Sequence, residues 1–222
     1  MKKLCLIAFA VVGLLVISCN TEKSVAALVT QEKKALPDNG KKLEIDTVRS
    51  LIRWKASHKG GFAPRWGTVS IQSGEVHIDG DQISGGKFII DMNSIKVNPA
   101  SVKEKNNTAA ELQAHLKSPD FFDTVKNPIS DFKITSVKNL ETKLHDAVPG
   151  ANKMISGNLT LSGKTVNVSF PAKVEATANK ASIQAKFTID RTELGIKFGT
   201  SEADPAEWMI SKNIKIDIDV KI

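Results

Sequence analysis

Side chains that could perform metal or acid–base chemistry are few in this 222-residue chain and lie far apart. The four histidines are His58, His77, His115 and His145, and none is spaced from another as zinc ligands usually are. His77 alternates onto the polar face of its segment, and His115 lies where a helix is expected, so we interpret both as structural. The sequence therefore predicts no metal site.

Motifs for covalent or phosphate chemistry are also missing from the sequence. It contains no nucleophile elbow, no glycine-rich phosphate loop and no pair of catalytic carboxylates. We interpret Asp190 and Arg191 as an ion pair at the end of a strand rather than as catalytic groups. These observations favour binding over catalysis, and we expect neither an enzyme nor a cofactor.

One residue, Cys19, has a clear chemical assignment. It follows two lysines and an apolar run from Leu4 to Ile17, and it closes the sequence VISC. That ending resembles the bacterial lipoprotein signal, which implies removal of the signal peptide 1–18 and a diacylglycerol thioether on the Cys19 sulfur. Acyl chains of the palmitate type anchor strongly, because each buried methylene contributes about 0.8 kcal/mol. The alternative is an ordinary signal peptide with an incidental cysteine.

The net charge does not indicate a nucleic-acid partner. The formal charge is +7, and removal of Lys2 and Lys3 leaves +5 on the mature chain. The excess is nearly all lysine, with only four arginines, whereas nucleic-acid readers rely on arginine for bidentate contacts. We interpret the lysines as solvated surface charge with some attraction to anionic membrane surfaces.

Composition divides the mature chain into two parts. Residues 19–42 alternate in charge sign and include the turn cluster LPDNG. We therefore expect a lipidated N-terminus and a flexible tether that contributes little to stability. Residues 43–222 have the length of one domain with a full core.

Apolar and polar residues alternate with a period of two through most of residues 43–222. NIKIDIDVKI at 213–222 shows this clearly, and ISGNLTLSGKTVNVSF at 155–170 is typical of a hairpin that turns at Ser162-Gly163. About eight strands without long amphipathic helices must join their apolar faces in a sandwich or a barrel. Three Trp and no Tyr argue against a membrane barrel with aromatic girdles. We predict an all-β antiparallel barrel with an apolar lumen.

A short helical excursion is predicted near residues 108–123. Thr108 and Glu111 have the spacing of a capping box for TAAELQAHL, and the helix must end before the next proline. We expect a second, short helix to follow and to place Phe121 and Phe122 on the barrel wall or across its mouth.

The stretch HLKSPDFFDTVKNPISDFKITSV at 115–137 resembles the signature of the YceI-like lipid-binding proteins: a His-Leu pair, a Ser, Asp-Phe-Phe-Asp, and a Pro four residues before a Phe. Other segments agree in order along the chain: IDTVRSLIRWKASH, FIIDMNSI, ISGNLTLSGKTVNVSF, FTIDRTELGI and ISKNIKIDIDV. The resemblance covers about residues 43–222. It departs at Asn127, where the family usually has an aromatic residue, and in GFAPRWGTV near the front.

The resemblance implies an extended antiparallel lipocalin-like β-barrel that holds a polyisoprenoid lipid, of the quinone or polyprenyl phosphate type, in an apolar tunnel. Several isoprene units must be buried, because each contributes at most about 4 kcal/mol while association costs about 4–15 kcal/mol. Twelve apolar residues are predicted to contact the lipid: Ile52, Trp54, Phe88, Ile90, Phe121, Phe122, Phe132, Leu159, Val168, Phe170, Phe187 and Ile216.

The alternative function is a structural or protein-interaction module of the cell envelope, with a filled lumen and no ligand. With either function, Cys19 would tether the protein to the bacterial cell envelope. Asn20 is not the Asp often associated with inner-membrane retention, so we expect the periplasmic face of the outer membrane. The sequence leaves the oligomeric state open, with a homodimer among the arrangements considered.

The acyl anchor predicts the behaviour of a Cys19→Ser variant. Without the thiol no thioether can form, so the domain should stay folded and be released when membranes are washed. Immunoblots of the membrane and soluble fractions measure this. A variant whose signal is cleaved but which still sediments with membranes would contradict the anchor.

Overall fold

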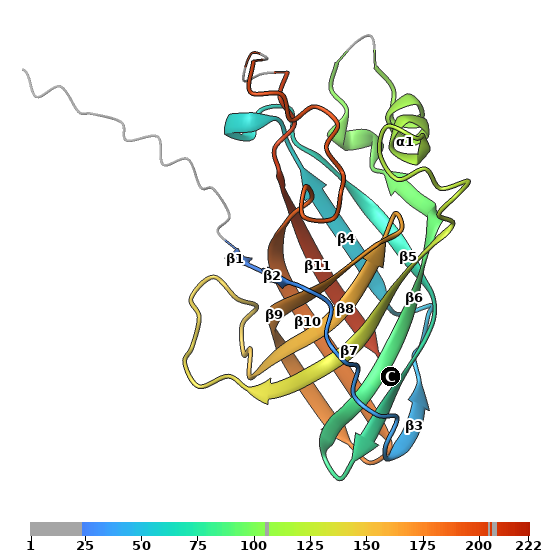
Figure 1. Ribbon diagram of the computed structural model, residues 1–222, viewed down its shortest axis with the longest axis vertical. Coiled ribbons are helices and arrows are strands. Elements are labelled where there is room, and N and C mark those ends of the chain that lie inside the picture. The colour runs from blue at the N-terminus through green and yellow to red at the C-terminus, as the bar shows by residue number, and fades with distance from the viewer. Residues whose placement is uncertain (1–23, 105–106, 204, 206–207) are drawn as a thin grey trace, which may run out of the picture.

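The structure is a computed structural model that describes residues 24–104, 107–203, 205 and 208–222. The predicted signal peptide and Cys19 lie outside these residues. Eight long strands form an elongated barrel, with α1 and the longest loops at one end (Figure 1). The elements in chain order are β1 (Val25–Ala26), β2 (Leu28–Thr30), β3 (Lys41–Glu44), β4 (Leu51–Ala56), η1 (Lys59–Gly61), β5 (Arg65–Asp79), β6 (Gln82–Val97), η2 (Pro99–Ser101), α1 (Ala109–Lys117), β7 (Ile129–Asn139), β8 (Lys153–Leu161), β9 (Lys164–Thr177), β10 (Lys180–Asp190) and β11 (Asn213–Lys221).

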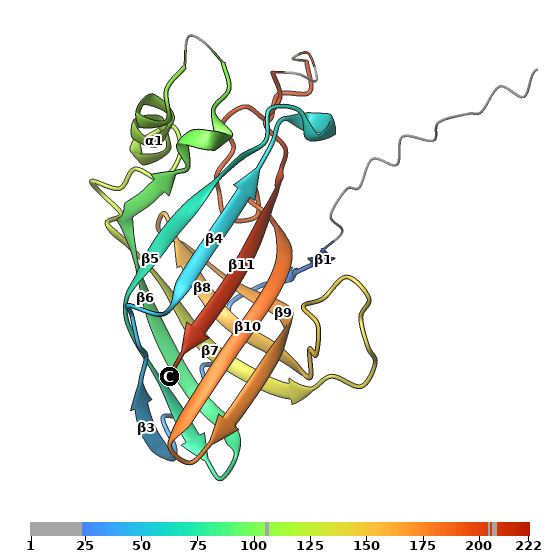
Figure 2. The same cartoon turned by 180° about the vertical axis from the view of Figure 1, so that it is seen from behind.

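Strands β4 to β11 pair in chain order, every pair antiparallel, and β11 returns to pair with β4. Figure 2 shows β11 lying between β10 and β4, where Ile218 is paired with Ile52. Closure satisfies the backbone hydrogen bonds that an open sheet would leave free at its edges. The predicted all-β antiparallel barrel is confirmed.

The period-two pattern places one face of each strand inside the barrel. On β10, Ile183, Ala185, Phe187 and Ile189 are buried, while the residues that alternate with them are half-buried. The predicted hairpin of β8 and β9 turns at Ser162 and Gly163, which have φ angles of 49° and 76°. Two consecutive residues with positive φ match the right-handed twist of the two strands.

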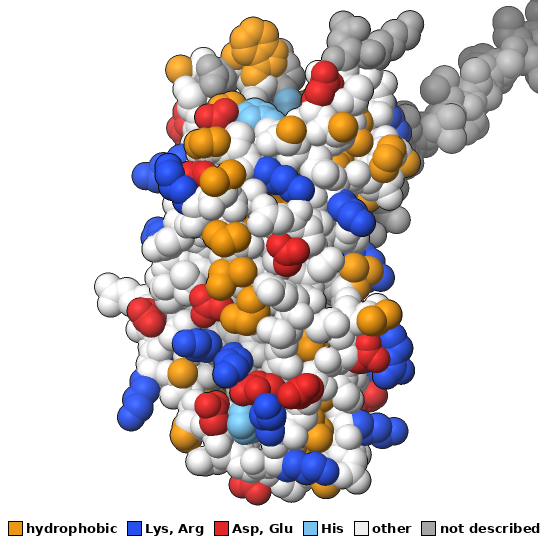
Figure 3. Space-filling model, turned by 90° about the vertical axis from the view of Figure 1, so that its right-hand side faces the viewer, with side chains coloured by type: hydrophobic (Ala, Val, Ile, Leu, Met, Phe, Trp, Pro, Cys, Tyr) orange, Lys and Arg blue, Asp and Glu red, His pale blue; other side chains and the backbone are white. Residues whose placement is uncertain are grey.

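One end of the barrel is filled with side chains. Ile78 and Ile83 flank the turn between β5 and β6, Val174 and Ala181 flank the turn between β9 and β10, and all four are buried in the core. We call this the closed end, and the opposite end, where α1 and η1 lie, the open end (Figure 1). Charged side chains crowd the surface near the closed end (Figure 3).

The predicted helix is present at the open end as α1. Thr108 accepts a hydrogen bond from the Glu111 N–H, and the Glu111 carboxylate accepts one from the Thr108 N–H. This capping box is the one that the sequence predicts. The helix packs against β6, where the Gln113 side chain accepts a hydrogen bond from the Val97 N–H.

The second short helix is wrong, because residues 118–122 form turns. The Phe122 N–H donates to the Leu116 carbonyl and the Asp123 N–H donates to the Ser118 carbonyl. Asp123 has a φ of 43°, which a right-handed helix does not allow. The Phe122 N–H therefore satisfies a carbonyl in the last turn of α1, and the Asp123 N–H satisfies that of the C-cap residue Ser118, instead of forming the bonds of a new helix.

Residues 24–44, which we call the N-terminal strap, lie against the outside of the barrel (Figure 1, blue). β1 pairs with β10 in parallel, β2 pairs with β9 and β3 pairs with β5, both antiparallel. Val29 and Leu36 pack against the core, and the Leu36 N–H donates to the Ile134 carbonyl. The expected flexible tether is therefore wrong for residues 24–42. The paired segments are two to four residues long, too short to show a period in the sequence.

Asn158 on β8 holds the middle of the strap. Its Oδ1 accepts a hydrogen bond from the Lys33 N–H and its Nδ2 donates to the Lys33 carbonyl, as the backbone of a neighbouring strand would. Asn167 donates to the same Oδ1 and to the Thr135 hydroxyl. Both asparagines are buried, although they belong to the outward face, because the strap covers them.

His77 is a second residue whose surroundings the strap changes. The sequence places it on the wet face, but β3 pairs with β5 there and leaves the histidine only 7% exposed. The carboxylates of Glu75 and Asp38 lie 3.6 and 3.7 Å from its Nε2. The alternation correctly predicted that His77 points out of the barrel, but it could not predict that β3 of the strap covers this side chain.

The strap predicts a stability effect for Asn158→Ala. This change removes the partner of the Lys33 backbone groups and one of the two hydrogen bonds of the Asn167 amide, which should lower the free energy of unfolding by about 1–3 kcal/mol. Urea denaturation measures the loss. Asn139→Ala is the control, because Asn139 is exposed and its amide oxygen accepts a single hydrogen bond, from Lys153, so its loss should cost less than about 0.5 kcal/mol. Equal losses in the two variants would contradict a strap that supports the fold.

Candidate binding cavity

A cavity of about 980 Å³ occupies the barrel lumen above the filled closed end. On β10 its wall runs from Ile183 to Ile189, a separation of six residues, or about 20 Å of strand. Its volume lies at the upper end of the range of about 300–1,000 Å³ that is usual for ligand sites. Most of its wall is aliphatic or aromatic, and its polar residues gather near the open end. An elongated apolar molecule fits such a space.

All twelve residues predicted to contact a lipid border this cavity. Ten of them come from seven of the eight barrel strands, and two come from the turns after α1. A closed barrel explains this, because every inward position of every strand faces the same lumen. That these side chains touch a lipid stays a prediction.

Four phenylalanines form a continuous band on the cavity wall. The ring centroids of Phe88 and Phe132 are 6.3 Å apart, those of Phe132 and Phe170 5.9 Å, and those of Phe170 and Phe187 4.3 Å. A methyl group at Gly157 would lie 2.2 Å from the Phe132 ring, so the glycine lets that ring lie flat against β8. The band narrows the lumen without filling it.

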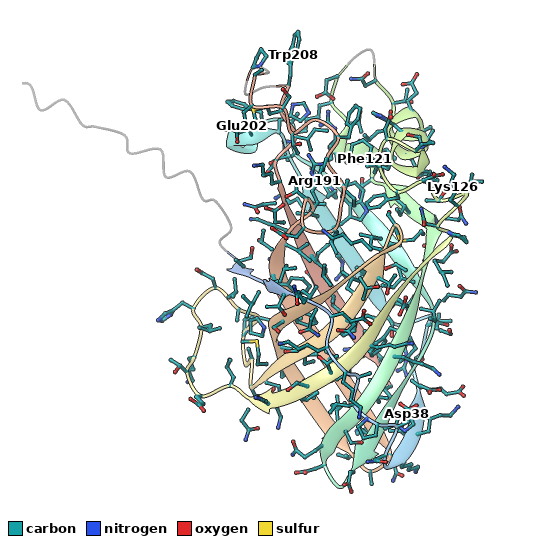
Figure 4. The ribbon with its side chains drawn as sticks, in the orientation of Figure 1. Asp38, Phe121, Lys126, Arg191, Glu202 and Trp208 are labelled. Carbon is teal, nitrogen blue, oxygen red and sulfur yellow. The ribbon has the colours of Figure 1, made fainter. Side chains whose placement is uncertain are left out.

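A second aromatic cluster borders the mouth of the cavity. The ring of His115 on α1 meets Phe121 edge-on at 5.0 Å and Phe198 at 4.9 Å, and Phe122 lies 6.5 Å from Phe121. The His115 Nε2 is also 3.0 Å from the Asp120 carboxylate. The labelled Phe121 lies beside α1 at the open end (Figure 4). Phe121 and Phe122 are half-buried, as parts of a lid would be.

Charged side chains at the mouth are paired within the protein. Arg65 donates hydrogen bonds to the Ser101 carbonyl and to the Glu104 carboxylate, the latter at 2.6 Å. This bond from Arg65 lowers the pKa of Glu104 below its usual value. Both residues border the cavity, as do His58 and Glu111. The charged groups of the cavity therefore lie at its mouth, beside the aromatic cluster, and the interior is apolar.

Arg191 corrects the predicted ion pair with Asp190. Its guanidinium is buried and donates to three backbone carbonyls, those of Ser211, Ile196 and Ile210, at 3.0, 3.0 and 3.1 Å. Burial lowers the pKa of Arg191, and the charge of Asp190 opposes that shift. Arg191 thus ties the loop after β10 to the barrel. Strand periodicity could not indicate this role, because the three acceptors are backbone atoms of a loop.

Two further features concern the part of the chain that the structure describes. Among residues 24–104, 107–203, 205 and 208–222, no group of three or more His, Cys, Asp or Glu side chains could hold a metal ion. Within the same residues, no helix combines the length and the apolar character needed to cross a membrane.

The sequence comparisons agree with one another. The YceI-like domain matches residues 43–222. A UPF0312 protein of Pseudomonas paraeruginosa is 26% identical over 168 residues, which cover 73% of this chain and 78% of that protein. A UPF0312 protein of Pseudomonas putida is 27% identical over 162 residues, which cover 70% and 76% of the two chains.

Solved structures show the same fold at low identity. Burkholderia cenocepacia BcnA superposes with a TM-score of 0.56 at 16% identity and covers 80% of this chain and 99% of its own. A polyisoprenoid binding domain from Saccharophagus degradans has a TM-score of 0.54 at 14% identity and covers 80% and 95%. These likenesses concern the barrel.

The lid geometry predicts that Phe121→Ala/Phe122→Ala behaves differently from Phe170→Ala. Phe170 is 4% exposed, and its truncation should cost about 3–5 kcal/mol of stability. Truncation of the half-buried pair Phe121 and Phe122 should cost less stability per ring. It should also speed the association of an apolar fluorescent dye, N-phenyl-1-naphthylamine, with the cavity by several-fold. Thermal melting and stopped-flow fluorescence measure the two effects. An unchanged dye rate with a core-sized loss of stability would show that both rings are ordinary core.

Proposed function

The chain belongs to the YceI-like domain family, and from this premise we propose that it binds and carries a polyisoprenoid lipid in the barrel cavity. In the proposal the acylated Cys19 tethers the protein to the cell envelope, at the periplasmic face of the outer membrane. We propose binding without a chemical reaction. The description of the Saccharophagus degradans domain as polyisoprenoid binding supports the choice of ligand.

The observation that carries the proposal is the shape and chemistry of the cavity. It follows the barrel axis, is lined by apolar side chains from all eight strands, and ends against the filled closed end. Each fully buried isoprene unit contributes at most about 4 kcal/mol, so a long lumen is needed to exceed the cost of association, about 4–15 kcal/mol. A shallow pocket would bury too few units.

The polar groups at the mouth favour a neutral head group. Arg65 already bonds Glu104, and Arg191 already bonds three carbonyls. A diphosphate would have to displace these partners, whereas a quinone needs only an occasional hydrogen bond. We therefore rank a quinone-type lipid above a polyprenyl phosphate, with its head near the open end and its tail among the phenylalanines.

The alternative of a filled structural module fits the cavity less well. Such a module would need large side chains to occupy the lumen, because an empty apolar space costs stability. The side chains of this barrel leave a cavity of about 980 Å³ in the lumen. That volume supports a ligand.

The proposal predicts which lipid is recovered with the protein. Protein purified from the envelope of its bacterial host without detergent exchange should release an isoprenoid lipid into organic solvent, at close to one molecule per chain by mass spectrometry. Leu159→Trp, which places an indole in the lumen, should reduce the recovered lipid severalfold. Lys133→Trp is the matched control, because Lys133 lies exposed on the neighbouring strand β7. Extracts that contain no isoprenoid, or equal recovery from the two variants, would contradict the proposed function.

A further inference from the structure

Three large aromatic side chains are exposed around the open end of the barrel. Phe62 is 59% exposed, Phe198 41% and Trp208 71%. They come from three separate segments: the loop after η1, and two parts of the loop between β10 and β11. Figure 4 shows Trp208 at the outermost tip of this end. Exposed aromatic side chains that gather at one place usually mark an interaction surface.

Backbone hydrogen bonds hold these segments together. The Lys59 N–H donates to the Met209 carbonyl at 2.7 Å, and the Ile210 N–H donates to the Gly199 carbonyl at 2.8 Å. Phe198 rests on the lid, with its ring centroid 5.0 Å from that of Phe121. The three aromatics are therefore presented by a connected scaffold around the mouth.

The apolar wall of the cavity continues onto this surface. Phe62 and Trp208 border the cavity and are also exposed to solvent. Phenylalanine and tryptophan are the side chains that typically enter the interface of a lipid bilayer. The closed end is different, since its turns are polar and charged side chains crowd the nearby surface (Figure 3).

The short length of chain between Cys19 and the barrel also favours the open end as the one that faces the membrane. Ser24 bonds the Thr188 hydroxyl, two residues before β10 ends at the open end. Residues 20–23 separate Cys19 from Ser24, and these five steps along the chain span at most about 18 Å. From Thr188 the open end of β10 is about 7 Å away along the strand, and the closed end at Lys180 is about 27 Å away. The N-terminal segment thus joins β10 nearer its open end than its closed end, which favours the open end as the one that an acyl chain on Cys19 turns toward the bilayer.

We infer that the open end of the barrel, through Phe62, Phe198 and Trp208, docks on the surface of a phospholipid bilayer. Docking would let a lipid pass between bilayer and cavity along a continuous apolar path. The passage of a lipid between bilayer and cavity rests on the proposed function. The docking itself depends on the surface and on the reach of the anchor.

The test uses the full mature chain with Cys19→Ser, so that no acyl chain contributes to binding. Vesicles of phosphatidylethanolamine and phosphatidylglycerol are floated on a sucrose gradient with the protein. Phe62→Ser/Trp208→Ser should lower the vesicle-bound fraction about tenfold or more, because two apolar side chains no longer leave water. Leu28→Ser/Val48→Ser is the matched control, since both residues are exposed and lie outside the cavity wall. Its bound fraction should match that of the parent.

We call Phe62→Ser/Trp208→Ser the rim variant, because both residues lie at the rim of the open end. The inference is overturned if the parent protein does not float with the vesicles, or if the rim variant floats like the control. Failure to float would favour a protein partner at the rim. Equal melting temperatures would show that the variants are folded.

Transfer kinetics separate this inference from the proposed function. Protein loaded with ubiquinone should release it to acceptor vesicles at a rate that rises with vesicle concentration, and the rim variant should do so about tenfold more slowly. Loaded protein that releases at a rate independent of vesicle concentration would preserve the proposed function and refute docking. Rim-dependent flotation of a protein whose extracts contain no isoprenoid would preserve docking and refute the proposed function.

Discussion

Closure of the eight-stranded ring is the constraint on which the rest of the structure depends. Once β11 pairs with β4, every inward side chain must share one lumen, and the number of strands sets the diameter of that lumen. The side chains fill the closed end and leave about 980 Å³ above it. The phenylalanine band and Gly157 then shape this space into a long apolar cavity. The cavity is thus a consequence of closure together with the choice of side-chain sizes.

Features that depend on strand alternation were predictable from the sequence. Features that arise where the strap or a loop packs over the barrel were not. Alternation placed ten of the twelve predicted contact residues on the cavity wall, and the capping box located α1, after which the other two follow. The strap was missed because its strands are too short to show a period. Asn158 and His77 were missed with it, since a polar residue on an outward face gives no sign that another segment buries it. Arg191 was misinterpreted for a related reason, because its partners are backbone carbonyls of the loop that follows it, which strand alternation does not describe.

The two ends of the barrel differ in a way that suits a lipid carrier. At the closed end, apolar side chains fill the lumen beneath polar turns. At the open end, buried and paired arginines support loops that present aromatic side chains, and His115 holds the lid rings together. Because the mouth is built from loops, the open end can exchange a ligand without disturbing the ring of strands.

A crystal structure of the protein isolated from its native envelope tests the central claim most directly. The account predicts one continuous, unbranched feature of electron density inside the lumen, from beneath the Phe121–Phe198 contact to the stacked rings of Phe170 and Phe187. It should be as long as several isoprene units and have its bulkier end near the mouth. A lumen that contains only ordered water, or one that collapsed side chains occupy, would contradict the claim that this barrel carries a polyisoprenoid lipid.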